Sequence, residues 1–102
     1  MKAWAWRRDS DDNSVNYWIQ VDNIKGKRKL NKVLKLLSNC QIVGDGYNAK
    51  TSEYTYIFAK TFDNIHTWHV WSEKFPIRLV ELTSHGNEKI RNKKMIQEGA
   101  VL

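Results

Sequence analysis

Six positively charged side chains and no acidic one fall between residues 24 and 39: Lys25, Lys27, Arg28, Lys29, Lys32 and Lys35. If this segment is helical, Arg28, Lys32 and Lys35 form a row opposite an apolar stripe. Like charges three or four residues apart repel one another along a helix. Because an external anion would relieve this repulsion, the row, with Lys25 and Lys29 beside it, predicts a surface that binds phosphate groups.

Other interpretations of the row stay open. An ordinary solvated helix face usually mixes charges of both signs, which this one does not. An acidic host protein would satisfy the same cations as nucleic acid does. A membrane surface is the least favoured interpretation, because the apolar stripe is needed for the core of the domain. This stripe consists of Leu30, Val33, Leu34 and Leu37.

A second group of cations lies near the C-terminus: Lys89, Arg91, Lys93 and Lys94. Apolar residues are spaced weakly there, at Ile90, Met95 and Ile96. We expect residues 84–102 to form either a short helix or a loosely ordered basic tail. We predict that the four cations of this segment also bind phosphate groups.

The aromatic side chains of two predicted strands suggest a surface suited to base stacking. If residues 54–62 and 65–73 are strands joined by a two-residue turn, Tyr56, Phe58 and Trp71 share one sheet face with Lys60. Rings on such a face can stack on bases, at about 1–3 kcal/mol per base, while a lysine holds phosphate. The same face could instead be core, a homodimer interface or a surface for another protein.

The same register predicts which sheet face forms the core. Ile57, Ala59, Trp68 and Val70 would point away from the aromatic face, and we expect this apolar set to be buried. In the first hairpin, a six-residue loop would place Trp4 and Trp6 with Tyr17 and Ile19, and Trp18 with Ala3 and Ala5. A slip of one residue would reverse this assignment.

Candidate catalytic and metal-binding residues do not form complete sites. His66 and His69 would point to opposite faces of a strand, and no second Cys/His pair completes a zinc site. The acidic run at residues 9–12 fits turn chemistry better than a calcium loop. Cys40 is expected to be a buried apolar residue. We therefore predict no enzyme, no metal and no cofactor.

The predicted elements are a hairpin, a helix and four further strands. The expected order is β-β-α-β-β-β-β, an α+β fold in which one amphipathic helix covers one face of an antiparallel sheet. Asn39 would cap the helix. The strands are predicted at residues 2–8, 15–21, 41–43, 54–62, 65–73 and 77–83, and the helix at residues 25–38.

The chain has 102 residues, a net charge of +6 and one cysteine. This length predicts a single domain over residues 1–102, and the charge favours acidic partners. The lone cysteine and the absence of an apolar run behind Met1 predict an intracellular protein without a signal peptide. Because one helix cannot cover all the aromatic surface, we also expect a homodimer or larger assembly.

The length, the composition rich in Lys, Asn, Tyr and Ile, and the lack of a family motif resemble those of small proteins from filamentous viruses of hyperthermophilic archaea. The resemblance concerns general character and aligns no residues. It implies a DNA- or host-binding protein in the host cytoplasm. The sequence thus predicts a non-enzymatic DNA- or RNA-binding protein, the alternative being an interaction or structural homo-oligomeric viral protein that binds no nucleic acid.

Overall fold

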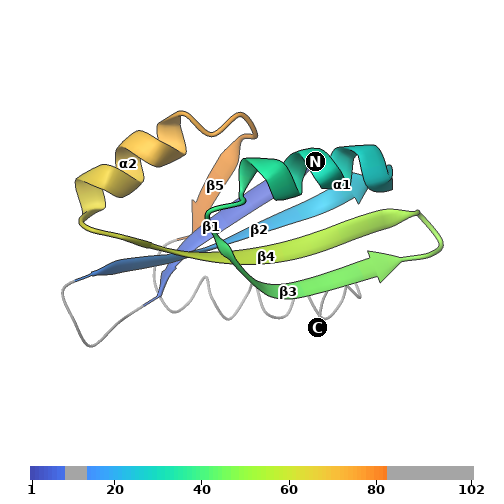
Figure 1. Ribbon diagram of the computed structural model, residues 1–102, viewed down its shortest axis with the longest axis horizontal. Coiled ribbons are helices and arrows are strands. Elements are labelled where there is room, and N and C mark those ends of the chain that lie inside the picture. The colour runs from blue at the N-terminus through green and yellow to red at the C-terminus, as the bar shows by residue number, and fades with distance from the viewer. Residues whose placement is uncertain (9–13, 83–102) are drawn as a thin grey trace.

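The computed structural model describes residues 1–8 and 14–82, which form five strands and two helices (Figure 1). The elements follow one another in the order β1 (Lys2–Arg8), β2 (Val15–Lys25), α1 (Gly26–Leu36), β3 (Gln41–Asn48), β4 (Glu53–Phe62), α2 (Ile65–Glu73) and β5 (Leu79–Leu82).

All five strands belong to one sheet, in the order β3-β4-β2-β1-β5. Three of the neighbouring pairs are antiparallel, and β5 runs parallel to β1. The α+β class and the largely antiparallel sheet are confirmed. The prediction of a single helix and of strictly consecutive antiparallel strands is wrong, because α2 carries the chain from β4 back to the far edge of the sheet.

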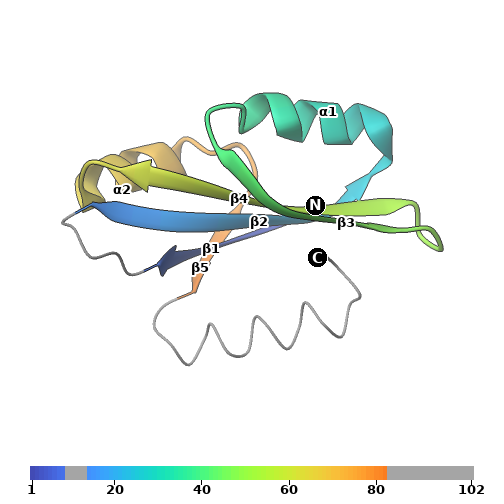
Figure 2. The same cartoon turned by 60° about the horizontal axis from the view of Figure 1, so that its bottom comes forward.

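Both helices pack on the same face of the sheet (Figure 2). The main core lies between them and that face. It joins Leu30 and Val33 of α1 to Ile19 and Phe58 of the central strands and to Trp68 of α2. A smaller cluster around Trp6 and Ile57 lies on the opposite face.

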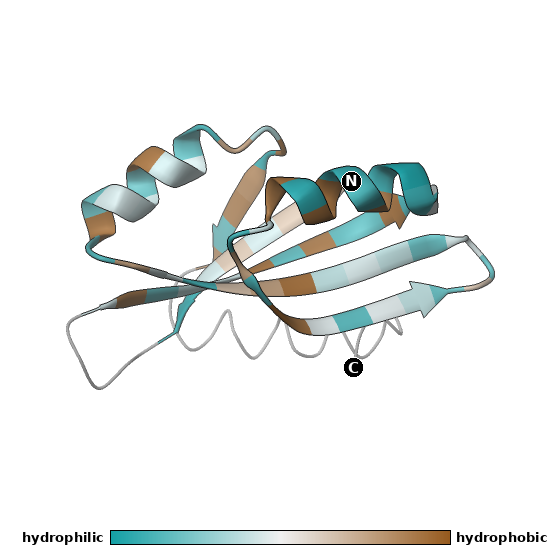
Figure 3. Cartoon of the chain, viewed as in Figure 1, coloured by the Kyte–Doolittle hydropathy of each residue, from teal (hydrophilic) through white to brown (hydrophobic). Residues whose placement is uncertain are grey.

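Helix α1 was predicted from its apolar spacing, and the structure confirms it at Gly26–Leu36. Leu30, Val33 and Leu37 are buried, and hydrophilic and hydrophobic positions alternate around the helix (Figure 3). The helix ends earlier than predicted, because Leu37 rather than Asn39 occupies the C-terminal cap.

Residues 65–73 form the helix α2 and not the predicted strand. Asp63-Asn64 is therefore not a hairpin turn. The side-chain oxygen of Asn64 accepts hydrogen bonds from the backbone N–H and the hydroxyl of Thr67, at 2.9 and 3.0 Å. An asparagine that accepts from the third helical residue is a favoured N-terminal cap. This cap follows the end of β4 at Phe62 and starts α2, which packs over the sheet.

We expect Asn64→Ala to lower the free energy of unfolding by about 1 kcal/mol, the usual value of such a cap. The cost arises because two donors of Thr67 lose their acceptor. Asn64→Asp is the matched control, since it keeps a side-chain oxygen at the cap and should cost less. Urea unfolding followed by circular dichroism measures both; equal losses for the two variants would contradict the capping role.

The pairing of β1 with β2 places Trp6 opposite Trp18 and Ala5 opposite Ile19. Directly paired residues lie on the same sheet face. Trp4, Trp6 and Trp18 therefore share the face away from the helices, and the predicted assignment of the tryptophans is wrong by one residue of register. On the other face, Ala5 lies with Ile19 beneath the helices.

The strands are longer than predicted at two places. β2 continues to Lys25 through an irregularity between Val21 and Ile24, where Asn23 has a positive φ of 57°. β3 continues to Asn48, where a loop was expected.

Within residues 1–8 and 14–82, no helix combines the length and the apolar character needed to cross a membrane.

Candidate nucleic-acid interface

The outward side of α1 carries the predicted cation row. Arg28, Lys32 and Lys35 are exposed, while Leu30 and Val33 on the opposite side are buried. The remaining cations of the segment are exposed as well: Lys25, Lys27 and Lys29. The structure therefore places five exposed cations on α1 and a sixth, Lys25, at the cap position directly before it.

The N-terminus of α1 concentrates this positive charge. Lys25 is the N-terminal cap residue, it makes no side-chain capping bond, and the first turn contains no acidic residue. The free N–H groups of a helix N-terminus carry a partial positive charge, so cations placed there are destabilising. Gly26 begins the helix at a φ of 83°, a conformation that residues with a side chain rarely adopt. The positive charge of Lys25 and of the helix N-terminus would be stabilised by a bound anion.

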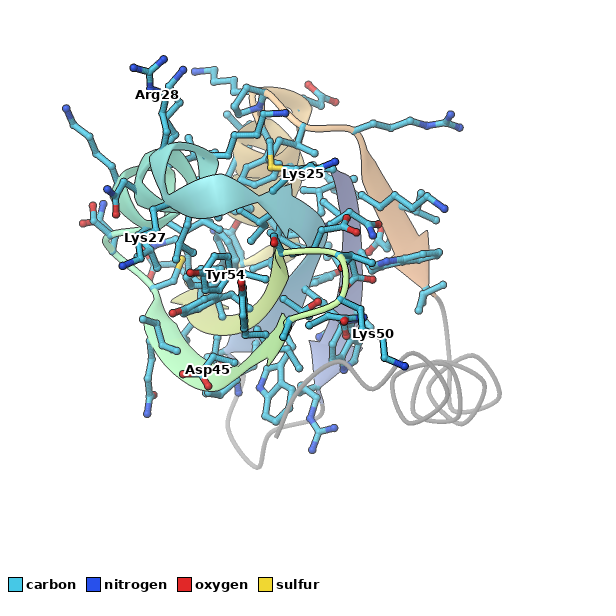
Figure 4. All side chains as sticks on the ribbon, turned by 90° about the vertical axis from the view of Figure 1, so that its right-hand side faces the viewer. Lys25, Lys27, Arg28, Asp45, Lys50 and Tyr54 are labelled. Atoms are coloured by element: carbon cyan, nitrogen blue, oxygen red, sulfur yellow. The ribbon has the colours of Figure 1, made fainter. Side chains whose placement is uncertain are left out.

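Figure 4 views this end of the molecule along the sheet. Arg28 points away from the sheet, and Lys27 and Lys25 leave the helix on different sides. The labelled carboxylate Asp45 comes from β3, on the other side of the strands from Arg28. These three cations thus point in different directions around the N-terminal end of α1, and the labelled Asp45 lies away from Arg28.

One acidic residue lies close to the row. Glu53 pairs with Lys25 in the register of β2 and β4, and its side chain accepts a 3.0 Å hydrogen bond from Asn23. Hydrogen bonds from Asn23 and Thr51, with a smaller attraction to Lys25, lower the pKa of Glu53. Among the described residues, the other five cations of α1 form no salt bridge with an acid.

The predicted stacking surface does not exist as a strand face. Phe58 is 1% exposed and belongs to the main core beneath the helices. Tyr56 is half-buried beside it, with ring centroids 6.0 Å apart. Trp71 is half-buried on α2, where its ring packs against Phe62 and Trp68. The helices cover the sheet face that carries Tyr56 and Phe58. The sequence had predicted the core on the opposite face, which carries Ile57.

Lys60 lies on the helix-covered face and is half-buried. Its ammonium group is 5.3 Å from the ring centroid of Phe62. Burial raises the pKa of the nearby Cys40 thiol, and the charge of Lys60 opposes that shift. Lys60 is therefore placed among the aromatic core residues and not in the outward row of α1.

His66 and His69 lie one helical turn apart on α2 and are both exposed. The expectation that they point to opposite faces is wrong, because it rested on a strand. Three or more potential metal ligands do not come together anywhere in residues 1–8 and 14–82. The predicted basic patch at Lys89, Arg91, Lys93 and Lys94 lies outside the described residues, as does the acidic run at residues 9–12.

A pocket of about 260 Å³ lies between α2 and β5. Trp68 and Phe75 form part of its wall, and Glu73, Arg78 and Glu81 line it as well. Its two acids and one arginine give it no excess of positive charge. The pocket therefore lacks the chemistry for phosphate, and α1 remains the strongest candidate site.

Sequence reasoning left two features out of the predicted site. Lys27 was counted among the cations but not among the binding residues, although it is as exposed as its neighbours. A buried polar group formed by Trp4, Gln20 and Asp22 was not predicted at all. The alternation of Gln20 and Asp22 along β2 is the only signal of it, and its meaning depends on the register with β1.

Comparison of the chain with protein-family models, with characterised proteins and with solved structures found no match.

Proposed function

We propose that the protein binds nucleic acid through the phosphate backbone, with α1 as the contact surface. The observation that carries this proposal is the set of five exposed cations on one short helix, none with a described acidic partner, together with Lys25 directly before it. A backbone contact of this kind is electrostatic and independent of sequence.

The distribution of charge supports a localised contact. The chain has 17 Lys and Arg residues and 11 Asp and Glu residues, so the six cations of residues 25–35 equal its net charge of +6. The other eleven cations are balanced by acids elsewhere. A basic surface confined to one element is the electrostatic footprint expected of a nucleic-acid-binding domain.

The geometry of α1 suits a row of phosphates. Arg28, Lys32 and Lys35 follow one another at about 6 and 4.5 Å along the helix axis, given a rise of about 1.5 Å per residue. Phosphates of one DNA strand are spaced at about 3.4 Å along the duplex axis. Long side chains spanning about 10 Å can therefore each reach a separate phosphate. Contacts to phosphate carry no sequence information directly, so we expect little sequence preference.

The test is binding to a labelled oligonucleotide, single-stranded and duplex, from about 50 to about 300 mM salt. Affinity should fall steeply, because releasing counterions from the nucleic acid becomes less favourable as the salt concentration of the solution rises. The triple variant Arg28→Gln, Lys32→Gln, Lys35→Gln should bind more weakly and flatten the slope of log affinity against log salt by about one unit per lost phosphate contact.

A matched triple variant controls for net charge. Lys50, Lys74 and Arg78 are exposed outside α1, and their replacement by Gln removes the same two lysines and one arginine. This variant should keep most of the affinity and slope of the unchanged protein. Equal weakening of binding by both triple variants would show that affinity depends on the overall charge of the protein and not on α1, and would contradict the proposed contact surface. No binding at the lowest salt would overturn the proposal and favour an acidic protein as the partner.

A further inference from the structure

The edge strand β3 carries an exposed tyrosine on the same side of the sheet as α1. Tyr47 is 53% exposed, and among residues 1–8 and 14–82 it is the one aromatic side chain in the exposed class. It pairs with Tyr54 of β4, and directly paired residues share a sheet face. Because Tyr54 packs against the main core beneath the helices, Tyr47 lies on that face too, at its uncovered edge.

The ring of Tyr47 is supported by its neighbour. The ring centroids of Tyr47 and Tyr54 lie 4.6 Å apart at an interplanar angle of 43°. Since Tyr54 is half-buried, the Tyr47 ring rests on a fixed group on one side and faces solvent on the rest of its surface. A fixed and exposed aromatic ring is suited to stacking on an unpaired base.

The tyrosine pair lies at the same end of the molecule as the start of α1. β3 is the edge strand outside β4, and α1 packs over β2 and β4. The backbone N–H of Gly26 donates a 3.4 Å hydrogen bond to the carbonyl of Ser52, which ties the first residue of α1 to the turn between β3 and β4. Figure 4 shows Lys27 leaving α1 on the side of β3, with Tyr54 between the helix and that strand.

The charge changes sign between α1 and β3. The helix carries five exposed cations, whereas β3 contains neither Lys nor Arg and exposes Asp45, two residues before Tyr47 on the same strand face. Phosphates are attracted to the helix and repelled by the Asp45 carboxylate. A nucleic-acid strand whose backbone follows α1 would therefore turn its bases toward β3. Ile42, which pairs with Phe58 and is 50% exposed, offers these bases an apolar contact further along the same face.

We propose that this side of the molecule binds a single strand of nucleic acid, with phosphates on α1 and a base stacked on Tyr47. The inference rests on the proposed function and deepens it by naming the form of nucleic acid. In a duplex the faces of the bases are stacked on one another, so Tyr47 cannot reach them, although α1 still reaches the phosphates. The stacking contact is thus available to a single strand alone.

The test compares a labelled thymine strand of about 12 nucleotides with the duplex that it forms with its complement. Tyr47→Ala should weaken single-strand binding by about 5- to 150-fold, which corresponds to about 1–3 kcal/mol for one stacked base, and leave duplex binding nearly unchanged. Tyr47→Phe is the matched control, since it keeps the ring and should keep the single-strand affinity. Val80→Ala removes an exposed side chain from the other edge strand and should change neither affinity.

Salt dependence separates stacking from charge. Stacking releases no counterions, so Tyr47→Ala should leave the slope of log affinity against log salt unchanged, whereas Lys27→Gln should flatten it by about one unit if one phosphate contact is lost. A strand of abasic sites keeps the phosphates and lacks the bases. Tyr47→Ala should therefore not weaken the binding of this strand.

The outcomes distinguish this inference from the proposed function. If Tyr47→Ala left single-strand binding unchanged, or weakened the single strand, the duplex and the abasic strand equally, the stacking site would be overturned while the phosphate contact of α1 stood. An equal loss in Tyr47→Phe and Tyr47→Ala would also overturn stacking by the ring. Absence of binding to any of the three at the lowest salt would overturn both proposals. A dimer of the free protein that Tyr47→Ala dissociates in sedimentation would assign the β3 edge to a second copy instead.

Discussion

Trp68→Ala should lower the free energy of unfolding by about 3–5 kcal/mol, the range found when a large buried aromatic side chain is removed from a core. Trp68 is 2% exposed and stacks on Tyr17, with ring centroids 3.6 Å apart and an interplanar angle of 8°. The edge of Phe62 meets the same ring at 5.4 Å. Since domains are stable by about 5–15 kcal/mol in total, this single change removes a large part of the stability.

Trp71→Ala is the matched control for this prediction. Trp71 lies one turn further along α2, contacts Phe62 and Phe75, and is half-buried. Its removal should cost clearly less, because less apolar surface returns to water. Urea unfolding followed by far-ultraviolet circular dichroism measures both variants without relying on tryptophan fluorescence. A Trp68→Ala loss no larger than that of Trp71→Ala would contradict the core position of Trp68.

The strand predicted at residues 65–73 shows how a short aromatic segment misleads. Thr67, Trp68 and Val70 occur readily in strands, and a nine-residue segment is too short for periodicity alone to decide. Tertiary packing decides the structure of this segment. Trp68 and Trp71 are three residues apart, and both can reach the Phe62 ring only from a helix that crosses the sheet. The Asn64 cap is visible in the sequence, although a turn explains the same residue equally well.

The first hairpin shows the effect of register. The segments 2–8 and 15–21 were predicted as strands, and the structure confirms both. Their pairing is shifted by one residue, because Arg8 pairs with Asn16 rather than with Val15. A shift of one residue moves every side chain to the other face. The sheet face that carries Trp4, Trp6 and Trp18 was therefore not predicted, and its buried Asp22 lay beyond the strand expected at residues 15–21.

Helix α1 was predictable because its two signals agree. Leu30, Val33 and Leu37 repeat at the spacing of one helical face, and the cations fill the positions between them. A helix that buries one stripe must expose the other, so the exposure of Arg28 and Lys32 follows from the sequence alone. Lys60 and Phe58 could not be assigned in this way, because both faces of β4 carry apolar residues.

Tyr17 links the sheet to its far edge. Its hydroxyl donates a 2.7 Å hydrogen bond to Glu81 Oε1, reaching from β2 across β1 to β5. Burial, the hydrogen bond to Glu81 and the negative charge of Glu81 raise the pKa of Tyr17 well above its usual value, against a smaller opposing effect of Arg7. The folded protein therefore holds this proton under conditions in which the unfolded chain releases it.

Stability should consequently fall as the pH rises above about 10, the ordinary pKa of tyrosine. Below that pH both states keep the proton and the contribution of Tyr17 is complete. Above it the unfolded chain binds one proton fewer than the folded one, so the free energy of unfolding should decrease by up to about 1.4 kcal/mol per pH unit until the folded pKa is reached. Urea unfolding at a series of pH values from 8 upward measures this slope.

Tyr17→Phe separates this effect from other alkaline transitions. The variant keeps the ring that stacks on Trp68 and loses only the hydroxyl, so at pH 8 it should be less stable by about 1 kcal/mol, the usual net value of a hydrogen bond. Above pH 10 its stability should fall less steeply, because no buried phenol remains to be ionised at this position. The raised pKa of Cys40 acts equally in both proteins and cancels in the comparison. The two stability curves should therefore converge as the pH rises, and parallel curves would show that Tyr17 does not hold its proton more tightly in the folded state.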